Sequence, residues 1–219
     1  MKIYPSVFAF LTLNIGDEII RFDNISSGLH VDIIDGSYIK NFGFPIYMAK
    51  MLRSYTQKPI HIHVMGFIDN LIDEIIECQP DVVFFHVDST QNPQAIIGKL
   101  LNNRIEPAIA VSYNKTDNKE TIMQYYRKIF DLYKQNNLQY LLLMTVNPGK
   151  CGQKFIESKK QELLQLNELF IDAKIIIDGG VNREILHDEI VKSNTYGAVV
   201  GSALYKNDFC IDKIRLILS

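Results

Sequence analysis

The sequence of 219 residues predicts an α/β fold, a single-domain (β/α)₈ barrel of the TIM-barrel type. Short apolar runs alternate with longer amphipathic stretches along the chain, and eight such units favour a closed barrel over a doubly wound open sheet. No glycine-rich dinucleotide fingerprint follows the first apolar run, which also weakens the open-sheet alternative. No linker-like or low-complexity segment interrupts the chain, so residues 1–219 are predicted to form one domain.

The eight predicted strands are short and nearly continuous in Ile, Val, Leu and Phe. This composition is typical of parallel strands that are buried on both faces. The predicted strands are residues 3–9, 29–34, 60–65, 82–87, 108–111, 140–144, 175–177 and 198–200.

A longer helix candidate follows each strand. Pro45 opens one of them, since proline is well tolerated in the first helical turn, and Asp69 and Asp73 favour the N-terminus of another. The predicted helices are residues 17–25, 45–55, 68–78, 93–103, 119–135, 158–170, 184–192 and 209–218.

Charge and cysteine content indicate the class of partner and the compartment. Lys and Arg number 23 against 25 for Asp and Glu, so the net charge of -2 gives no reason to expect nucleic acid or an acidic membrane as partner. Cys78, Cys151 and Cys210 contain no CxxC pair and are typical of reduced thiols in the cytoplasm. The chain shows neither a signal peptide nor an apolar run near the roughly 18–20 residues of a membrane helix. We expect a cytoplasmic protein that acts on a small molecule.

Four potential metal ligands lie near the carboxyl ends of predicted strands, where barrels place their catalytic groups. Residues two apart in a strand point to one side, so His30 and Asp32 project together, with His63 and Asp178 on two other strands. A mixed nitrogen and oxygen ligand set suits Zn²⁺, Fe²⁺, Mn²⁺ or Co²⁺ better than Mg²⁺ or Ca²⁺. Such an ion can bind two substrate oxygens and stabilise an enediolate. The two aspartates also offer an acid/base pair on opposite sides of a sugar carbon.

Glycine-rich loops after the last three strands predict a phosphate site. Glycine lets backbone N–H groups approach an anion closely, and barrels often bind phosphate after strands seven and eight. The residues concerned are Gly149, Gly152, Gly179, Gly180, Gly201 and Ser202.

Several other conspicuous residues receive structural interpretations. His61, His86 and His187 are expected to be structural or exposed, because no other ligand stands in register with them. Lys150 is expected to be a solvated loop residue and Cys151 a tolerated small residue, with no general base beside it. Asp35 is expected to shape the turn before Gly36, and Met65 and Met144, by residue type alone, are core residues.

The motifs together resemble the ribulose-phosphate 3-epimerase family over nearly the whole chain. Residues 5–7 (PSV) resemble its opening strand, residues 30–36 (HVDIIDG) its signature after strand two, and residues 63–65 (HVM) its H-x-M motif. Residues 144–149 (MTVNPG) with 152–155 (GQKF) match its loop after strand six, and residues 178–180 and 201–203 complete the set.

The resemblance implies a metal-dependent isomerase that interconverts D-ribulose 5-phosphate and D-xylulose 5-phosphate. His30, Asp32, His63 and Asp178 would hold a divalent ion, often zinc or iron. Asp32 and Asp178 would exchange the C3 proton on opposite faces through a 2,3-enediolate. The resemblance further implies a homo-oligomer, a dimer or a hexamer.

The resemblance also assigns substrate contacts. Ser6 would hydrogen-bond near the substrate, and Met65 and Met144 would pack against the intermediate.

Departures from the family pattern leave more than one ketose phosphate as a candidate substrate. Residues 9–11 are apolar, Ile34 replaces a methionine, residues 40–44 differ, and the phosphate loop contains Lys150 and Cys151. A six-carbon ketose phosphate such as D-allulose 6-phosphate is therefore an alternative substrate, and a non-catalytic sugar-phosphate-binding relative is a second alternative. A decarboxylase or aldolase is a third, but those relatives typically use a lysine near strand two or three, and residues 30–35 and 61–65 contain none.

Overall fold

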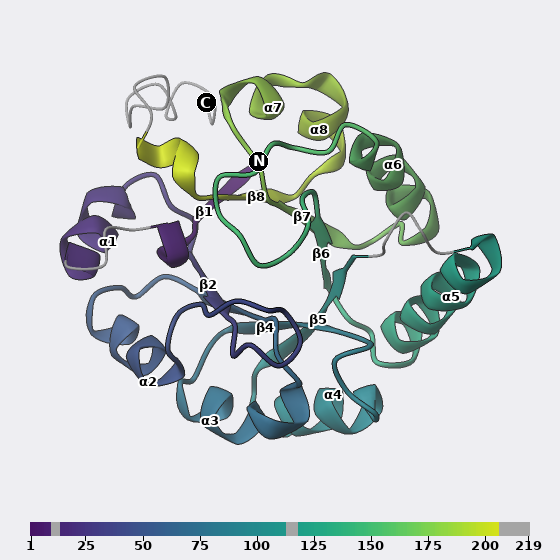
Figure 1. The fold of residues 1–219 in the computed structure, drawn as a ribbon, viewed down its shortest axis with the longest axis horizontal. Coiled ribbons are helices and arrows are strands. Elements are labelled where there is room, and N and C mark those ends of the chain that lie inside the picture. The colour runs from purple at the N-terminus through teal and green to yellow at the C-terminus, as the bar shows by residue number, and fades with distance from the viewer. Residues whose placement is uncertain (10–13, 113–117, 206–219) are drawn as a thin grey trace.

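A computed structural model describes residues 1–9, 14–112 and 118–205. Within these ranges, eight parallel strands form one sheet in the order β1-β8-β7-β6-β5-β4-β3-β2. A single bridge between Ser6 and His30 joins the two ends, so the sheet curls into a nearly closed barrel (Figure 1). The strands are β1 (Lys2–Pro5), β2 (Leu29–Ile33), β3 (Ile60–Val64), β4 (Val82–His86), β5 (Glu106–Val111), β6 (Tyr140–Met144), β7 (Lys174–Asp178) and β8 (Gly197–Val200). The predicted (β/α)₈ barrel is confirmed.

Helices form a ring outside the barrel (Figure 1). The α-helices are α1 (Ile15–Asp23), α2 (Ile46–Ala49), α3 (Ile72–Glu77), α4 (Pro93–Asn102), α5 (Lys119–Gln135), α6 (Lys159–Leu169), α7 (Arg183–His187) and α8 (Glu189–Asn194). The 3₁₀ helices are η1 (Val7–Ala9), η3 (Lys50–Ser54), η4 (Ile68–Asn70) and η5 (Ser202–Tyr205). None of the helices in the described ranges combines the length and apolar composition that a bilayer crossing requires.

Three predicted elements are shortened or divided in the structure. Residues 7–9 form η1 rather than continuing the first strand, because Ala9 N–H turns back to the Ser6 carbonyl. Residues 45–55 divide into α2 and η3, with Pro45 at the N-cap and not in the first turn. Residues 184–192 divide into α7 and α8 at Asp188, whose extended backbone stops one helix and whose carboxylate caps the next at Val191 N–H.

A fourth predicted element is also divided, and one predicted helix falls outside the described residues. Residues 68–78 begin as η4 and continue as α3. The predicted helix at 209–218 lies outside the described residues, as do Cys210 and two residues of the apolar segment 9–11.

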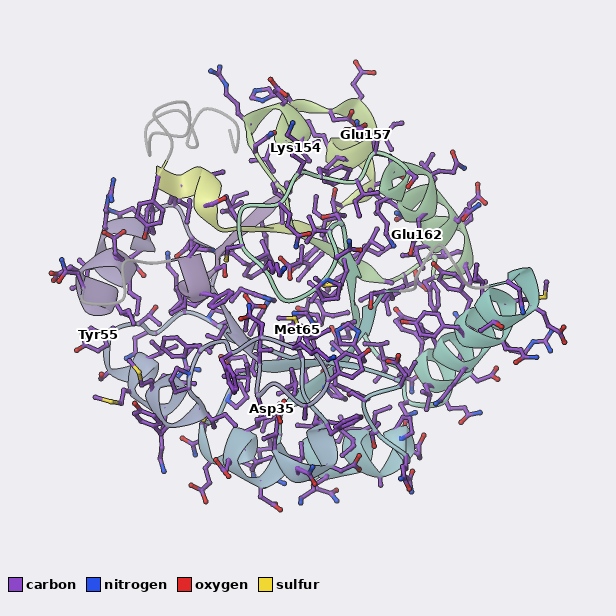
Figure 2. The ribbon with its side chains drawn as sticks, in the orientation of Figure 1. Asp35, Tyr55, Met65, Lys154, Glu157 and Glu162 are labelled. Carbon is purple, nitrogen blue, oxygen red and sulfur yellow. The ribbon has the colours of Figure 1, made fainter. Side chains whose placement is uncertain are left out.

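Side chains alternate along each strand between two apolar cores, one between the strands and the helices and one inside the barrel. On β7, Ile175 and Ile177 face the helices, whereas Ile176 and Asp178 face the barrel interior. The same alternation turns the outer residues of β2 and β3 toward the helices and leaves their polar residues inside. Figure 2 shows Met65 near the centre of the barrel mouth and Tyr55 at the periphery. Any polar side chain on an inward position near a strand's carboxyl end therefore reaches the mouth.

Truncating the outer core should test this assignment. Ile177→Ala removes a fully buried side chain, and we expect it to lower the free energy of unfolding by about 2–5 kcal/mol. Ile171→Ala is the matched control, because that side chain is 81% exposed, and should change stability by less than about 0.5 kcal/mol. Urea unfolding followed by circular dichroism measures both, and equal losses would contradict the burial assigned to β7.

Candidate metal centre and catalytic pocket

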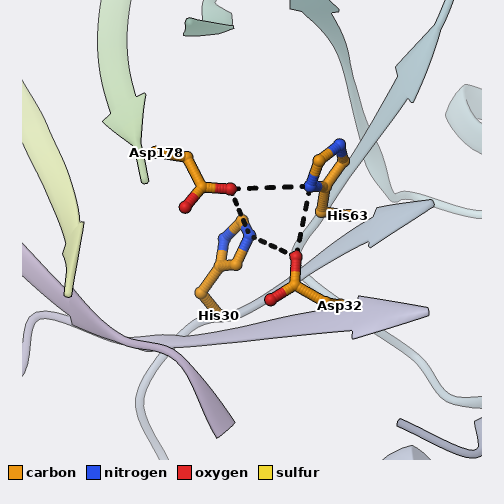
Figure 3. A group of neighbouring side chains, drawn as sticks. All are labelled: His30, Asp32, His63 and Asp178. Carbon is orange, nitrogen blue, oxygen red and sulfur yellow. Dashed lines mark hydrogen bonds and ion pairs between the residues drawn. The ribbon is translucent and has the colours of Figure 1, made fainter. Parts of the chain in front are cut away.

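Four predicted ligands converge in the barrel mouth: His30, Asp32, His63 and Asp178 (Figure 3). Each offers one ligand atom, and all four atoms lie within 4.8 Å of one another. Asp32 Oδ1 lies 3.4 Å from His30 Nε2 and 3.2 Å from His63 Nδ1, and Asp178 Oδ2 lies 3.6 Å from each of these nitrogens. Side chains from β2, β3 and β7 thus meet at one point.

The spacing and chemistry of these atoms fit a divalent ion. Ligand atoms about 2.0–2.2 Å from a common ion lie about 2.8–3.6 Å apart when they are tetrahedral or octahedral neighbours. The four nitrogen–oxygen separations fall in that range. Both ring nitrogens of His30 are buried and have no hydrogen-bond partner among the described residues, and Nε2 faces the two carboxylates. A buried polar atom without a partner is costly, and a metal ion would satisfy it.

Electrostatics at the site favour positive charge between the carboxylates. Burial would raise the pKa of the Asp32 carboxyl, but attraction to His30, together with the hydrogen bond and attraction to His63, holds it well below its usual range. Burial would likewise lower the pKa of the His63 imidazole, but hydrogen bonds and attraction to Asp178 and Asp32 raise it to about 9. Two buried carboxylates that draw a proton onto a neighbouring imidazole also provide the charge that a divalent cation requires.

Neighbouring groups fix the two carboxylates. The Ser6 hydroxyl donates to Asp32 Oδ2 at 3.1 Å, leaving Oδ1 directed at the histidines. The backbone N–H of Thr145 donates to the Asp178 carbonyl at 2.7 Å, and its single hydroxyl hydrogen is shared between the carbonyls of Asp178 and Gly179, which lie 2.9 and 2.6 Å from the hydroxyl oxygen. Ser6 therefore orients the Asp32 carboxylate, and Thr145 holds the backbone from which the Asp178 side chain projects.

A cavity of 590 Å³ opens beside this centre. It is lined by both aspartates and by every residue predicted to contact substrate: Ser6, Met65, Met144, Gly149, Gly152, Gly179, Gly180, Gly201 and Ser202. Loops that are far apart in the sequence therefore share one wall of the barrel mouth. Their assignment as substrate contacts stays a prediction.

Close loop packing explains two of the glycines. A Cβ on Gly180 would lie 2.2 Å from the backbone nitrogen of Phe155, and one on Gly179 would lie 2.2 Å from the Val146 side chain. Both glycines also have positive φ, +66° and +110°, which other residues rarely adopt. The segment between β6 and α6 can therefore lie directly against the turn after β7.

Comparison with known proteins identifies the family. Residues 2–205 match the model of the "Ribulose-phosphate 3 epimerase family". The ribulose-phosphate 3-epimerase of Methanocaldococcus jannaschii is 30% identical over 185 residues, which cover 82% of this chain and 73% of that protein. That of Bacillus subtilis is 26% identical over 212 residues, covering 94% and 92%.

The chain belongs to the ribulose-phosphate 3-epimerase family. It is therefore an enzyme of the isomerase class, and the resemblance carried by the sequence motifs is confirmed. Solved phosphoribosylanthranilate isomerases share the fold alone: those of Pyrococcus furiosus and Thermococcus kodakaraensis give TM-scores of 0.63 and 0.67 at 15% and 14% identity. The alignments cover 99% of this chain and 96% and 98% of those chains.

Segments that depart from the ribulose-phosphate 3-epimerase pattern border the mouth. The Asn41 side-chain amide donates to the Gly149 carbonyl, so the loop after β2 touches the loop after β6. Asp35 Oδ1 accepts a hydrogen bond from Ser37 N–H at 2.9 Å, as expected for a turn residue. Ile34 lines the cavity, and the Phe44 N–H donates to the Asp32 carbonyl at 2.8 Å, so the altered residues border both the cavity and the backbone of one proposed metal ligand.

Lys150 and Cys151 both line the cavity and are exposed. Although the residue is exposed overall, partial desolvation inside the cavity, with Asp32 and Asp178 nearby, raises the pKa of the Cys151 thiol to about 11. The thiol is therefore protonated at neutral pH, which agrees with its interpretation as a non-nucleophilic residue.

The sequence patterns did not single out several residues that line the cavity, among them the cation Lys154. Lys154 and Glu157 lie along the segment between β6 and α6 (Figure 2), and Asn182 lines the cavity just before α7. The position of Lys154 in the GQKF motif was the available signal.

The remaining histidines separate into three cases. His61 is buried, with its ring 4.4 Å from that of Tyr4, and burial lowers its pKa to about 3. His187 is exposed, with Nδ1 2.8 Å from the Arg183 carbonyl. His86 is buried directly against His63, a contact that the sequence did not predict.

Removing one ligand should weaken metal binding without loss of the barrel. For His30→Ala we expect a fall of at least about 100-fold in Zn²⁺ affinity, since even residues outside the ligand shell contribute about 10–100-fold. His187→Ala, which changes an exposed histidine, should bind Zn²⁺ as the unmodified protein does. Competition with a chromophoric chelator measures both. Unchanged affinity in His30→Ala would place the metal elsewhere.

Proposed function

We propose that this isomerase is a metal-dependent 3-epimerase that interconverts D-ribulose 5-phosphate and D-xylulose 5-phosphate. The observation that carries the proposal is the pair Asp32 and Asp178, which approach one point from β2 and β7 and line one cavity. Family membership supplies the reaction class.

The proposed chemistry is a two-base proton transfer. One aspartate removes the proton from C3 of the ketose phosphate, giving a 2,3-enediolate, and the other returns a proton on the opposite face. Asp32 suits the task of base, because its histidine neighbours keep it ionised. Asp178, held by backbone contacts from Thr145, stands on the other strand.

A divalent ion held by His30, Asp32, His63 and Asp178 would supply the Lewis acidity that makes a proton next to a carbonyl acidic enough for a carboxylate. The chain's own groups would orient the substrate around it. Met65 and Met144, both nearly fully buried at the cavity wall, would pack on the flat intermediate and exclude water.

The phosphate group would lie at the glycine turns that follow β7 and β8. Glycine backbone at residues 179–180 and 201, with the Ser202 hydroxyl, offers the donors that an anion needs, and Lys154 adds a positive charge. The cavity volume of 590 Å³ falls within the usual range of about 300–1,000 Å³ for small-molecule sites.

The same proposal covers metal, partner, assembly and compartment. The mixed ligand set favours Zn²⁺ or Fe²⁺, with Mn²⁺ or Co²⁺ as alternatives. The partner is a small ketose phosphate, with no nucleic acid or membrane, in line with the net charge of -2. Family likeness favours a homo-oligomer, a dimer or a hexamer. The free thiols of Cys78 and Cys151 favour a cytoplasmic location.

Proton NMR in D₂O tests the reaction. The metal-loaded protein should introduce deuterium at C3 of ribulose 5-phosphate while xylulose 5-phosphate forms, and a chelator should abolish both. Asp32→Asn and Asp178→Asn should each lower kcat/KM by about 10²–10⁴-fold, because each removes one of two proton carriers. Asp172→Asn, at an exposed site, is the control. Full activity in either carboxamide variant would contradict the two-base scheme.

Substrate choice needs a direct comparison of sugars. We expect kcat/KM for ribulose 5-phosphate to exceed that for allulose 6-phosphate by at least about tenfold, a difference of about 1.4 kcal/mol. The reverse preference would establish the six-carbon alternative and direct attention to Ile34 and residues 40–44. Bound metal without exchange on either sugar would instead support a sugar-phosphate-binding relative without catalytic activity.

A further inference from the structure

His86 links the metal centre to the next strand of the barrel. It ends β4, is fully buried, and its Nε2 lies 3.0 Å from Nε2 of His63. Its other nitrogen, Nδ1, lies 3.2 Å from the Ser112 hydroxyl just after β5. A row of polar groups therefore runs from Asp32 through His63 and His86 to Ser112.

Which group donates and which accepts in this row is determined by the number of hydrogens on the two imidazole rings. Two facing Nε2 atoms share one hydrogen, so one imidazole donates and the other accepts. His63 presents Nδ1 to the carboxylates and the metal position. A neutral imidazole that gives its Nδ1 lone pair to a metal carries its hydrogen on Nε2. His63 then donates to His86, and His86 in turn donates from Nδ1 to Ser112.

We propose that His86 is a positioning residue for the metal ligand His63. By accepting the Nε2–H of His63, it selects the tautomer whose Nδ1 lone pair faces the metal and fixes the plane of the ring. The inference rests on the proposed metal site and adds to it a residue that touches neither metal nor substrate. Ligating histidines commonly gain affinity and orientation from a group that accepts their second N–H.

The surroundings of His86 fit this task. The Tyr38 ring, from the loop after β2, lies 5.3 Å from the His86 ring at 33°, and the Tyr38 hydroxyl donates to Asp88 at 2.8 Å. The Ser89 hydroxyl donates to the His86 carbonyl at 2.8 Å. Contacts on the ring face, the backbone and Nδ1 thus define one orientation of the imidazole, which leaves Nε2 directed at His63.

A purely structural role predicts different behaviour. A packing histidine would matter for the stability of the metal-free protein, but would not alter the metal once the barrel has formed. His61 provides the comparison: it is equally buried, on the adjacent strand, and its Nδ1 has no hydrogen-bond partner among the described residues.

Cobalt binding to the full-length protein separates the two roles. His86→Phe should lower Co²⁺ affinity by about 10–100-fold and change the visible absorption spectrum of bound Co²⁺. His86→Gln, whose amide oxygen can accept from His63, should restore most of the affinity. His61→Phe should leave affinity and spectrum unchanged, and thermal unfolding of each metal-free variant should account for any packing loss.

A second variant covers the case in which His86→Phe fails to fold. Ser112→Ala removes the acceptor for His86 Nδ1 and should lower Co²⁺ affinity by about tenfold, at the lower end of the same range. If the folded His86 and Ser112 variants bind Co²⁺ with wild-type affinity and spectrum while His30→Ala loses binding, the role of His86 is overturned. The metal site itself then stands. Wild-type binding in His30→Ala as well would overturn the metal site itself.

Discussion

Two buried carboxylates that share a pair of imidazoles are the interaction on which the rest of this structure depends. Burial of like charges is unfavourable unless positive charge lies between them. His63 provides part of that charge, in line with its raised pKa, and His30 directs at both carboxylates a nitrogen that has no hydrogen-bond partner in the described part of the chain. The arrangement of these four side chains therefore favours the binding of a cation between them. The barrel supplies the rigidity that holds four such groups within 4.8 Å.

Rigidity comes from the layers on each side of the strands. The outward residues of β2, β3 and β7 are apolar and anchor each strand to the helices, so that the inward residues cannot rotate away. Thr145 adds a local restraint, because its contacts fix the backbone at Asp178. The glycine turns then let the loop after β6 lie close to this backbone. Packing, backbone hydrogen bonds and loop conformation thus together hold the backbone segment that carries the Asp178 carboxylate.

Strand periodicity explains why the site was predictable from the sequence. The predictions failed where a single cap or a contact between distant residues decides the structure. His30 with Asp32, and the placement of His63 and Asp178 at strand ends, follow from the two-residue repeat and from the rule that barrels carry chemistry at carboxyl ends. The division of 184–192 into two helices depends on a single cap at Asp188, which competes with a helical pattern that continues through it. The contact between Asn41 and Gly149 joins residues 108 apart, and no local pattern encodes it.

His86 shows the limit of local patterns most clearly. In the sequence it is a histidine at the end of an apolar run, and structural burial is the ordinary expectation for such a residue. Its relevance arises from a neighbouring strand, because His63 and His86 meet edge to edge only when β3 and β4 lie side by side. The solved phosphoribosylanthranilate isomerases have the same barrel at 12–15% identity, so the fold alone does not specify these contacts. In this chain the specific chemistry therefore resides in a few inward side chains near the carboxyl ends of the strands, together with the hydrogen bonds that orient them.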